Sequence, residues 1–421
     1  MGVRFRRVCF ACGEVLSREN PWGRCPRCGS YGVPRFDPAL PLKDSRFRRM
    51  WRYWPRLPLE GADPVTLGEG DTPLVPLRED SGPGRLWVKW EGLNPTGTYK
   101  DRPASVTVSR ARETGAGGVI VASDGNNGPA VAAYAARAGL PCLVLMPRDT
   151  PAFRCRQAAA YGARIVLVEG DINDCLEVSE AWGRELGYPD GSTAIHLNPY
   201  HEEADKTIAY EIFEELGRVP DWVSVPLGGG GVCAGVCRGF RDLADLGLTD
   251  RVPRPVAAQA AACAPFVRAV REGRPLRREP CPGRTLALTI AVPFPADGEI
   301  ARQALEASGG EAVAVEEAEL AAATLLLARQ GMLVEPTGAV SLAALLRCRR
   351  EGLVREGDVA VAVATGTGLK VLGEWEDLEN LDRSILRIPR GAGVPEALRE
   401  EAARRMPPRG GGSPEERGVR S

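Results

Sequence analysis

The sequence lacks a strong net charge and long apolar runs. Its 421 residues carry a formal net charge of −1, which gives no electrostatic argument for a nucleic-acid or membrane-surface partner. The longest apolar stretches, such as VAVAVAT at 359–365, have the length of a strand and are too short to cross a membrane. The opening residues, MGVRFRRVCFACGE, contain basic residues but no apolar core of signal-peptide length. We therefore expect a cytoplasmic protein.

Cysteine is plentiful, with twelve residues against two histidines. In a reducing compartment we expect these cysteines to be free or metal-bound rather than paired. Eight of them are scattered through apolar segments and are expected to be small core residues. These are Cys142, Cys155, Cys175, Cys233, Cys237, Cys263, Cys281 and Cys348.

The other four cysteines form two CxxC pairs, Cys9 and Cys12 in CFACG and Cys25 and Cys28 in CPRCG. Two such pairs with a short spacer supply four thiolates, which suits tetrahedral zinc, and the glycine after each pair lets backbone amides turn toward the sulfurs. We predict a structural zinc ribbon over residues 1–36. The alternatives are a degenerate ribbon and a redox pair. With four ligands filling the zinc coordination, the site would stabilise the module and take no part in chemistry.

Short Val/Ile/Leu-rich runs alternate with alanine-rich amphipathic runs from about residue 85 to 370. This alternation predicts an α/β architecture with parallel sheets, and the number of units favours two lobes. We assign residues 37–389 to this region, with a smaller lobe at roughly 102–205, and expect the polar, glycine-rich residues 390–421 to be disordered. The strand candidates are RLWVKWE (85–91), GGVIVAS (117–123), PCLVLMP (141–147), RIVLVEG (164–170), TAIHLN (193–198), DWVSVPLG (221–228), RPVAAQA (254–260) and VAVAVATG (359–366).

Lys100 lies in NPTGTYKDR (94–102), just after turn-forming Asn-Pro and Thr-Gly dipeptides. The segment that follows, DRPASVTVSRARE (101–113), can open as a helix because proline is tolerated just inside a helix start. The lysine would then have a fixed base and a mobile tip. A surface lysine is the alternative from this stretch alone.

Two further loops follow strand candidates and present polar side chains. SDGNNG (123–128) combines Gly125, which permits an unusual backbone, with the amides of Asn126 and Asn127. ATGTGLK (364–370) places the hydroxyls of Thr365 and Thr367 after the most apolar strand. A hydroxyl at that position can hydrogen-bond a neutral heterocyclic nitrogen. Ordinary turns remain the alternative for both loops.

The third loop, GGGGVCAG (228–235), has four consecutive glycines before a helix. Their backbone amides form a phosphate cradle with no side chains in the way. The Lys-Ser/Thr pair of a P-loop is absent, and the next strand ends on neutral residues rather than on the acid of a dinucleotide fingerprint. A flexible hinge is the alternative. Together, an imine-forming lysine, a monophosphate cradle, an amide for a phenolic oxygen and a hydroxyl for a ring nitrogen are what pyridoxal phosphate requires.

With these motifs in this order, the sequence resembles the threonine synthases of the tryptophan synthase β-like group (fold type II) of pyridoxal phosphate enzymes. The similarity runs from the cysteine pairs to about residue 375. It also includes WRYWPRLPL (51–59), TLGEGDTPLVPL (66–77), HLNPYHEEADKTIAYEI (196–212) and EPTGAVSLAAL (335–345). The resemblance implies a two-lobed parallel-sheet fold, an amino-acid substrate and a homodimer.

The resemblance also implies a role for individual residues. Lys100 matches the lysine that binds the cofactor and moves protons at Cα and Cβ, Asn126 the asparagine beside the cofactor's 3-hydroxyl, and Thr365 the threonine that faces its pyridine nitrogen. A threonine synthase expels phosphate from the γ-carbon of O-phosphohomoserine and adds water at Cβ. The phosphate loop would comprise Gly228, Gly229, Gly230, Gly231 and Val232, and the substrate side Ser123, Asn127, Asn198, His201 and Lys206.

Two departures from the family pattern concern the substrate. Asp124 and Asn127 stand where the family has hydroxyls that help to hold the substrate's phosphate, and His201 stands where an arginine is expected. Both changes argue against a phosphorylated substrate. SDGN also resembles the loop of diaminopropionate ammonia-lyases, in which the aspartate is linked to an amino-bearing substrate or a second base, so Asp124 is a second catalytic candidate. The leading function is threonine synthesis; the alternative is an ammonia-lyase or dehydratase acting on a non-phosphorylated amino acid.

Overall fold

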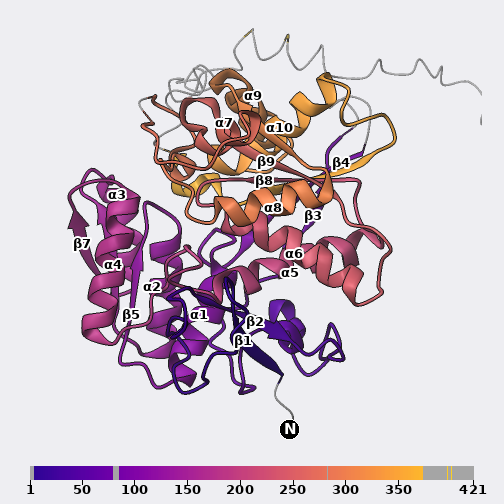
Figure 1. Ribbon diagram of the computed structural model, residues 1–421. Coiled ribbons are helices and arrows are strands. Elements are labelled where there is room, and N and C mark those ends of the chain that lie inside the picture. The colour runs from indigo at the N-terminus through magenta and orange to yellow at the C-terminus, as the bar shows by residue number, and fades with distance from the viewer. Residues whose placement is uncertain (1–3, 79–84, 282, 373–395, 397–399, 401–421) are drawn as a thin grey trace, which may run out of the picture. The chain divides into compact units, whose positions relative to one another are not determined.

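The computed structural model describes residues 4–78, 85–281 and 283–372, together with residues 396 and 400 (Figure 1). The chain divides into residues 1–374 and residues 375–421, and the following account concerns the first unit. The tail expected to be disordered, 390–421, lies outside the described residues apart from those two positions. Within the described residues, no helix has both the length and the apolar character needed to cross a membrane.

The larger sheet has six strands in the order β10-β9-β8-β11-β4-β3. Its five parallel strands are β4 (Arg85–Trp90), β8 (Trp222–Pro226), β9 (Arg254–Ala260), β10 (Glu311–Val315) and β11 (Val359–Ala364), while β3 (Leu74–Pro76) is antiparallel to β4. Every residue of β8 and β11 is buried. Burial on both faces explains their continuous apolar sequences and confirms the predicted parallel sheet.

The smaller sheet is parallel, with β5 (Val119–Ala122), β6 (Cys142–Pro147) and β7 (Arg164–Val168) in that order. Four helices accompany it: α1 (Asp101–Glu113), α2 (Asn127–Ala138), α3 (Ala152–Ala160) and α4 (Ile172–Leu186) (Figure 1). Two separate parallel sheets confirm the expected two-lobed fold class.

The remaining α-helices pack around the larger sheet. They are α5 (His201–Leu216), α6 (Gly231–Asp245), α7 (Pro265–Arg271), α8 (Gly298–Ser308), α9 (Glu317–Arg329) and α10 (Pro336–Arg350). The helices α5 and α6 approach closely because α6 carries glycines at the contact. A Cβ at Gly235 would lie 2.6 Å from Cβ of Asp205, and one at Gly239 would lie 2.5 Å from the carbonyl oxygen of Lys206.

The N-terminal cysteine module contains the antiparallel strands β1 (Phe5–Cys9) and β2 (Gly32–Phe36). It packs onto the rest of the first unit through aromatic contacts. Trp22 lies edge-on to Tyr200 with ring centroids 4.8 Å apart, and the Tyr200 hydroxyl donates a hydrogen bond to the carbonyl of Pro21. Phe5 joins a buried cluster that includes Trp51.

Two sequence expectations about local structure are wrong. Residues 193–198 form turns rather than a strand, because the chain pairs with β5 only around Asp190, and the N–H groups of Leu197 and Asn198 then bond back to the carbonyl of Ala194. Cys263 and Cys281 are paired in a disulfide rather than free. The chain returns beside β9 after α7, a proximity that composition and compartment do not reveal.

A buried ion network joins three elements near Lys100. The guanidinium of Arg102 on α1 donates to Glu91, which follows β4, with Nε to Oε2 at 2.8 Å, and to Glu211 on α5, with Nη2 to Oε2 at 2.7 Å. Lys89 also contacts Glu211, with Nζ to Oε2 at 3.0 Å, and all four side chains are buried. Burial opposes ionisation, yet Arg102 and Lys89 hold the pKa of Glu211 well below its usual range.

We expect Arg102→Ala to lower the free energy of unfolding by about 3–5 kcal/mol, because Glu91 and Glu211 would be left buried without their shared partner. Urea unfolding followed by circular dichroism measures the loss. Arg148→Ala is the matched control, since Arg148 pairs with Glu169 on the surface and such pairs contribute little. Equal stability of the two variants would contradict the prediction.

Candidate active site and cysteine cluster

Three neighbouring strands of the larger sheet place the predicted loops together. The strands β8, β11 and β4 are adjacent and parallel, so their carboxyl ends meet at one edge. The glycine loop follows β8, Thr365 follows β11, and the Lys100 loop follows β4 by way of a short helical turn, Glu91–Leu93. One cavity is lined by all three and by the Ser123–Asn127 loop after β5.

Lys100 is held at the start of α1, with its side chain in this cavity. Its Nζ lies 4.3 Å from the ring centroid of Tyr99. Burial lowers the pKa of Lys100 to about 8, although Asp205, Asp124 and Asp297 act in the opposite direction. An amine with that pKa exists in both protonation states near neutral pH, as a group that forms imines and moves protons must.

The glycine loop forms a cradle with no room for side chains. Gly230 has φ of 109°, and a Cβ there would lie 2.8 Å from backbone atoms of Asp297. Gly231 begins α6, and the first amides of a helix have no partner within the helix. These amides, together with the helix dipole, fit the monophosphate of pyridoxal phosphate.

Thr365 and Asn126 present polar groups to the same cavity. Thr365 is 3% exposed, and its Oγ1 has no hydrogen-bond partner among the residues that the structure describes. Such an orphaned hydroxyl fits the pyridine nitrogen of the cofactor. The amide of Asn126 donates from Nδ2 to both carboxylate oxygens of Glu335, at 2.8 and 3.1 Å, which fixes its orientation.

Four of the residues predicted for the substrate side or catalysis also line the cavity: Ser123, Asp124, Asn127 and His201. The Ser123 hydroxyl accepts a hydrogen bond from the N–H of Gly125 at 3.1 Å, and the Asn127 amide donates to the carbonyl of Gly191 at 2.9 Å. Burial raises the pKa of Asp124, against the effects of Arg154 and Lys100. Burial and Lys100 together lower the pKa of His201 well below its usual value, so its imidazole is neutral.

Asn198 and Lys206, also predicted for the substrate side, do not line this cavity. The Asn198 amide donates to the hydroxyl of Thr107 at 2.9 Å. Nζ of Lys206 lies 2.7 Å from carboxylate oxygens of both Glu203 and Asp242. Both side chains are committed to contacts between helices, which corrects the sequence-based placement.

Sequence reasoning missed three acids of the site. Asp297 and Glu335 line the cavity, and Asp205 lies beside Lys100. Burial raises the pKa of Asp205 to about 8, and burial and Glu202 raise that of Asp297 well above its usual range. A neutral Asp297 is compatible with a phosphate held at Gly230 and Gly231. The i, i+4 spacing of His201 and Asp205 is the sequence signal that could have indicated one of these acids.

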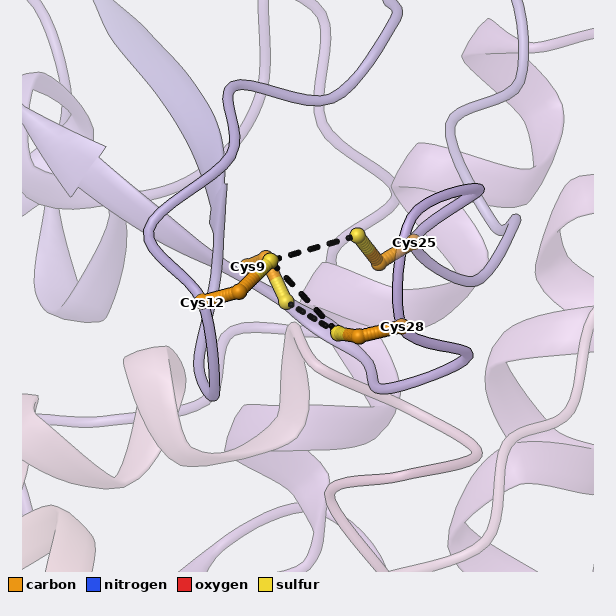
Figure 2. Close-up of side chains that lie close together, drawn as sticks. All are labelled: Cys9, Cys12, Cys25 and Cys28. Carbon is orange, nitrogen blue, oxygen red and sulfur yellow. Dashed lines mark hydrogen bonds between the residues drawn. The ribbon is translucent and has the colours of Figure 1, made fainter.

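The four N-terminal cysteines gather into a single cluster. Figure 2 shows their side chains pointing toward one another, and all four sulfur atoms lie within 4.8 Å of one another. Gly13 and Gly29 both have φ of 73°, and their N–H groups bond to the carbonyls of Cys9 and Cys25. Each CxxCG segment therefore makes the expected tight turn. The cluster could hold a metal ion.

Two parallel sheets, a buried lysine, a glycine cradle and an orphaned hydroxyl at the strand ends define a fold type II pyridoxal phosphate enzyme. The family described as "Pyridoxal-phosphate dependent enzyme" matches residues 65–366, and the chain belongs to it.

Its curated relatives are threonine synthases. That of Synechocystis sp. is 39% identical over 80% of this chain and 87% of its own. That of Methanosarcina acetivorans is 35% identical over 86% of this chain and 91% of its own. The protein is therefore a threonine synthase-like lyase.

Solved structures of other family members share the fold. A bacterial threonine deaminase, from T.th., is 28% identical, with a TM-score of 0.58 over 70% of this chain and 92% of its own. Diaminopropionate ammonia lyase of Escherichia coli has a TM-score of 0.64 at 17% identity, over 76% of this chain and 90% of its own, and shows the fold alone.

We expect Gly230→Ala to weaken cofactor binding. An alanine there would carry a strain of about 1–3 kcal/mol, equivalent to about ten- to a hundredfold in affinity. Titration of the cofactor-free protein with pyridoxal phosphate, followed by visible absorbance, measures the affinity. Gly247→Ala is the control, since Gly247 also has positive φ, 68°, but its Cβ would meet nothing within 4 Å. Retained affinity in Gly230→Ala would rule out the cradle.

Proposed function

We propose that the protein is a threonine synthase that eliminates phosphate from O-phosphohomoserine and adds water to give threonine. The observation that carries this proposal is Lys100 in one cavity with the glycine cradle and the Thr365 hydroxyl, at the ends of three adjacent strands. The threonine synthase relatives, 35 and 39% identical over most of the chain, support the choice of reaction.

Each residue of the cavity has a task in this proposal. Pyridoxal phosphate, when bound, supplies an electron sink for bond breaking at the substrate's carbon atoms. The amides of Gly228, Gly229, Gly230 and Gly231, with Val232 behind them, hold its phosphate, and the Thr365 hydroxyl meets its ring nitrogen. Asn126, oriented by Glu335, contacts its 3-hydroxyl.

Lys100 binds the cofactor covalently and, once released, accepts and returns protons at Nζ. Its pKa of about 8, set by burial against Asp205, Asp124 and Asp297, allows both directions of transfer near neutral pH. Ser123 and Asn127 are held by Gly125 and Gly191, so they present fixed polar groups to the substrate. His201 offers a neutral ring, and Asp124 a second proton-accepting group.

We expect the wild-type enzyme to release phosphate and form threonine from O-phosphohomoserine. Lys100→Ala should lose both this activity and the visible absorbance of the covalently bound cofactor, because no other amine is held in the cavity among the described residues. Phosphate release and amino-acid chromatography measure turnover. Threonine formation at the wild-type rate by Lys100→Ala would exclude this lysine.

One observation favours a second candidate, an ammonia-lyase or dehydratase acting on a non-phosphorylated amino acid. Asp124, Asp297 and Glu335 line the cavity, whereas Lys100 is the one cationic side chain among its described lining residues. Such a charge balance attracts an amine and opposes a second phosphate. Keto-acid and ammonia release from diaminopropionate, serine or threonine, without turnover of O-phosphohomoserine, would select this candidate.

The N-terminal cluster is proposed as a structural zinc site, because four thiolates and no other ligand suit tetrahedral zinc. We also propose a ribbon at residues 1–36, a catalytic region at 37–389 with its smaller lobe at roughly 102–205, a homodimer, and a cytoplasmic location. The near-neutral charge and the amino-acid chemistry support that location.

The purified protein should contain a single zinc ion per chain, as four cysteine ligands complete one site. Cys25→Ser should lose most of the zinc and some thermal stability, while the folded fraction keeps its turnover number. Elemental analysis measures the metal. Cys142→Ser is the control, because Cys142 is buried in the smaller sheet and should leave the zinc content unchanged. Full zinc in Cys25→Ser would contradict the assignment.

A further inference from the structure

His201 and Asp205 form a pair in the first turn of α5. They are four residues apart, so both project from the same side of the helix, and Nε2 of His201 lies 3.5 Å from Oδ2 of Asp205. Both residues are 0% exposed. His201 lines the cavity that also contains Lys100.

The polar atoms of this pair have no conventional partners. Within the described part of the chain, neither ring nitrogen of His201 and neither carboxylate oxygen of Asp205 makes a hydrogen bond. Buried polar groups are nearly always hydrogen-bonded, and exceptions mark functional sites. A histidine and an aspartate serving only to fill space would be replaced by apolar side chains without loss.

The charged groups around Asp205 come from three other elements besides α5 itself. Lys100, at the start of α1, acts on it most strongly; Glu202, Arg102 and Glu91 follow. Arg102 is already bound by Glu91 and Glu211. Glu202 is bound by Arg238, with Nη1 to Oε2 at 3.1 Å. Lys100 is therefore the group around Asp205 whose charge is not already balanced by one of these contacts.

We propose that His201 and Asp205 hold one proton beside Lys100 and exchange it with the Lys100 amine, so that Asp205 is a positioning residue for proton transfer. The proposal rests on the role of Lys100 in the proposed function. In the exchange, the O–H bond of Asp205 breaks and an N–H bond forms at Nζ of Lys100, directly or through the ring of His201. A carboxylic acid and an amine become a carboxylate and an ammonium, and total charge is conserved.

The electrostatics of the two groups support the exchange. Burial lowers the pKa of Lys100 to about 8 and raises that of Asp205 to about 8. Matched values make the transfer nearly free of thermodynamic cost, which is the condition for efficient proton transfer. When Lys100 takes a proton from the substrate, an ionised Asp205 stabilises the ammonium that forms.

The test is a pH titration of the visible absorbance of the cofactor-bound enzyme without substrate. In Asp205→Asn we expect the midpoint to move to lower pH by about one unit or more, because a carboxylate no longer stabilises the protonated nitrogen of Lys100. The turnover number should fall, with little change in KM. Asp190→Asn is the matched control: Asp190 is a buried acid bound by Ser179 and Ser192, far from these roles, and should titrate as the wild type does.

An unchanged midpoint in Asp205→Asn overturns the proposal. If that variant does not fold, His201→Phe replaces it: loss of the ring nitrogens should move the midpoint in the same direction, and an unchanged midpoint again overturns the proposal. The titration needs bound cofactor but no substrate. Failure to turn over O-phosphohomoserine therefore refutes the proposed function and leaves this measurement valid.

Discussion

The active site depends on a backbone clamp between two loops. The carbonyl of Thr365 accepts hydrogen bonds from the N–H of Tyr99 and the hydroxyl of Thr98, both at 3.0 Å, and the N–H of Thr367 donates to the carbonyl of Gly97 at 2.9 Å. These bonds extend the pairing of β4 with β11 beyond the sheet. Because backbone groups form the clamp, the side chains of Lys100 and Thr365 remain available to a ligand in a fixed relative position.

The two residues after Lys100 hold this loop in place and do not line the cavity. The Asp101 carboxylate accepts hydrogen bonds from the N–H of Thr96 at 3.1 Å and from its hydroxyl at 2.8 Å, which closes the turn before the lysine. Arg102 binds Glu91 and Glu211, which fixes α1 against β4 and α5. In the sequence Lys-Asp-Arg, one residue is thus free for chemistry because its two neighbours are fully engaged in structure.

The sequence was sufficient to locate the parts of the site that follow from strand order. Glycine-rich or hydroxyl-bearing loops after apolar strands meet wherever the strands are parallel neighbours, and the Lys100, Gly228 and Thr365 loops needed no more than that. Asp205, Asp297 and Glu335 could not be found this way. Their positions depend on the packing of α5 on α6, on a loop that returns to the glycine cradle, and on the start of α10, none of which has a local signature.

The misplacement of Lys206 has the same origin. One turn of α5 has two functional faces, and helical geometry separates them. His201, Glu202 and Asp205 face the cavity and the glycine cradle, where Cγ of Glu202 would lie 3.9 Å from a Cβ at Gly231.

Glu203 and Lys206 face the opposite way, where Lys206 pairs with Glu203 and Asp242 and its Nζ lies 4.8 Å from the ring centroid of Phe36 in the cysteine module. Tyr200, one residue before the helix, packs on Trp22 of the same module. The first turn of α5 therefore links the cysteine module to the residues around Lys100. Its cavity face is where His201 replaces the arginine that the family resemblance implies. A change of substrate could thus be accommodated on one face of this turn without disturbing the contacts that anchor the other.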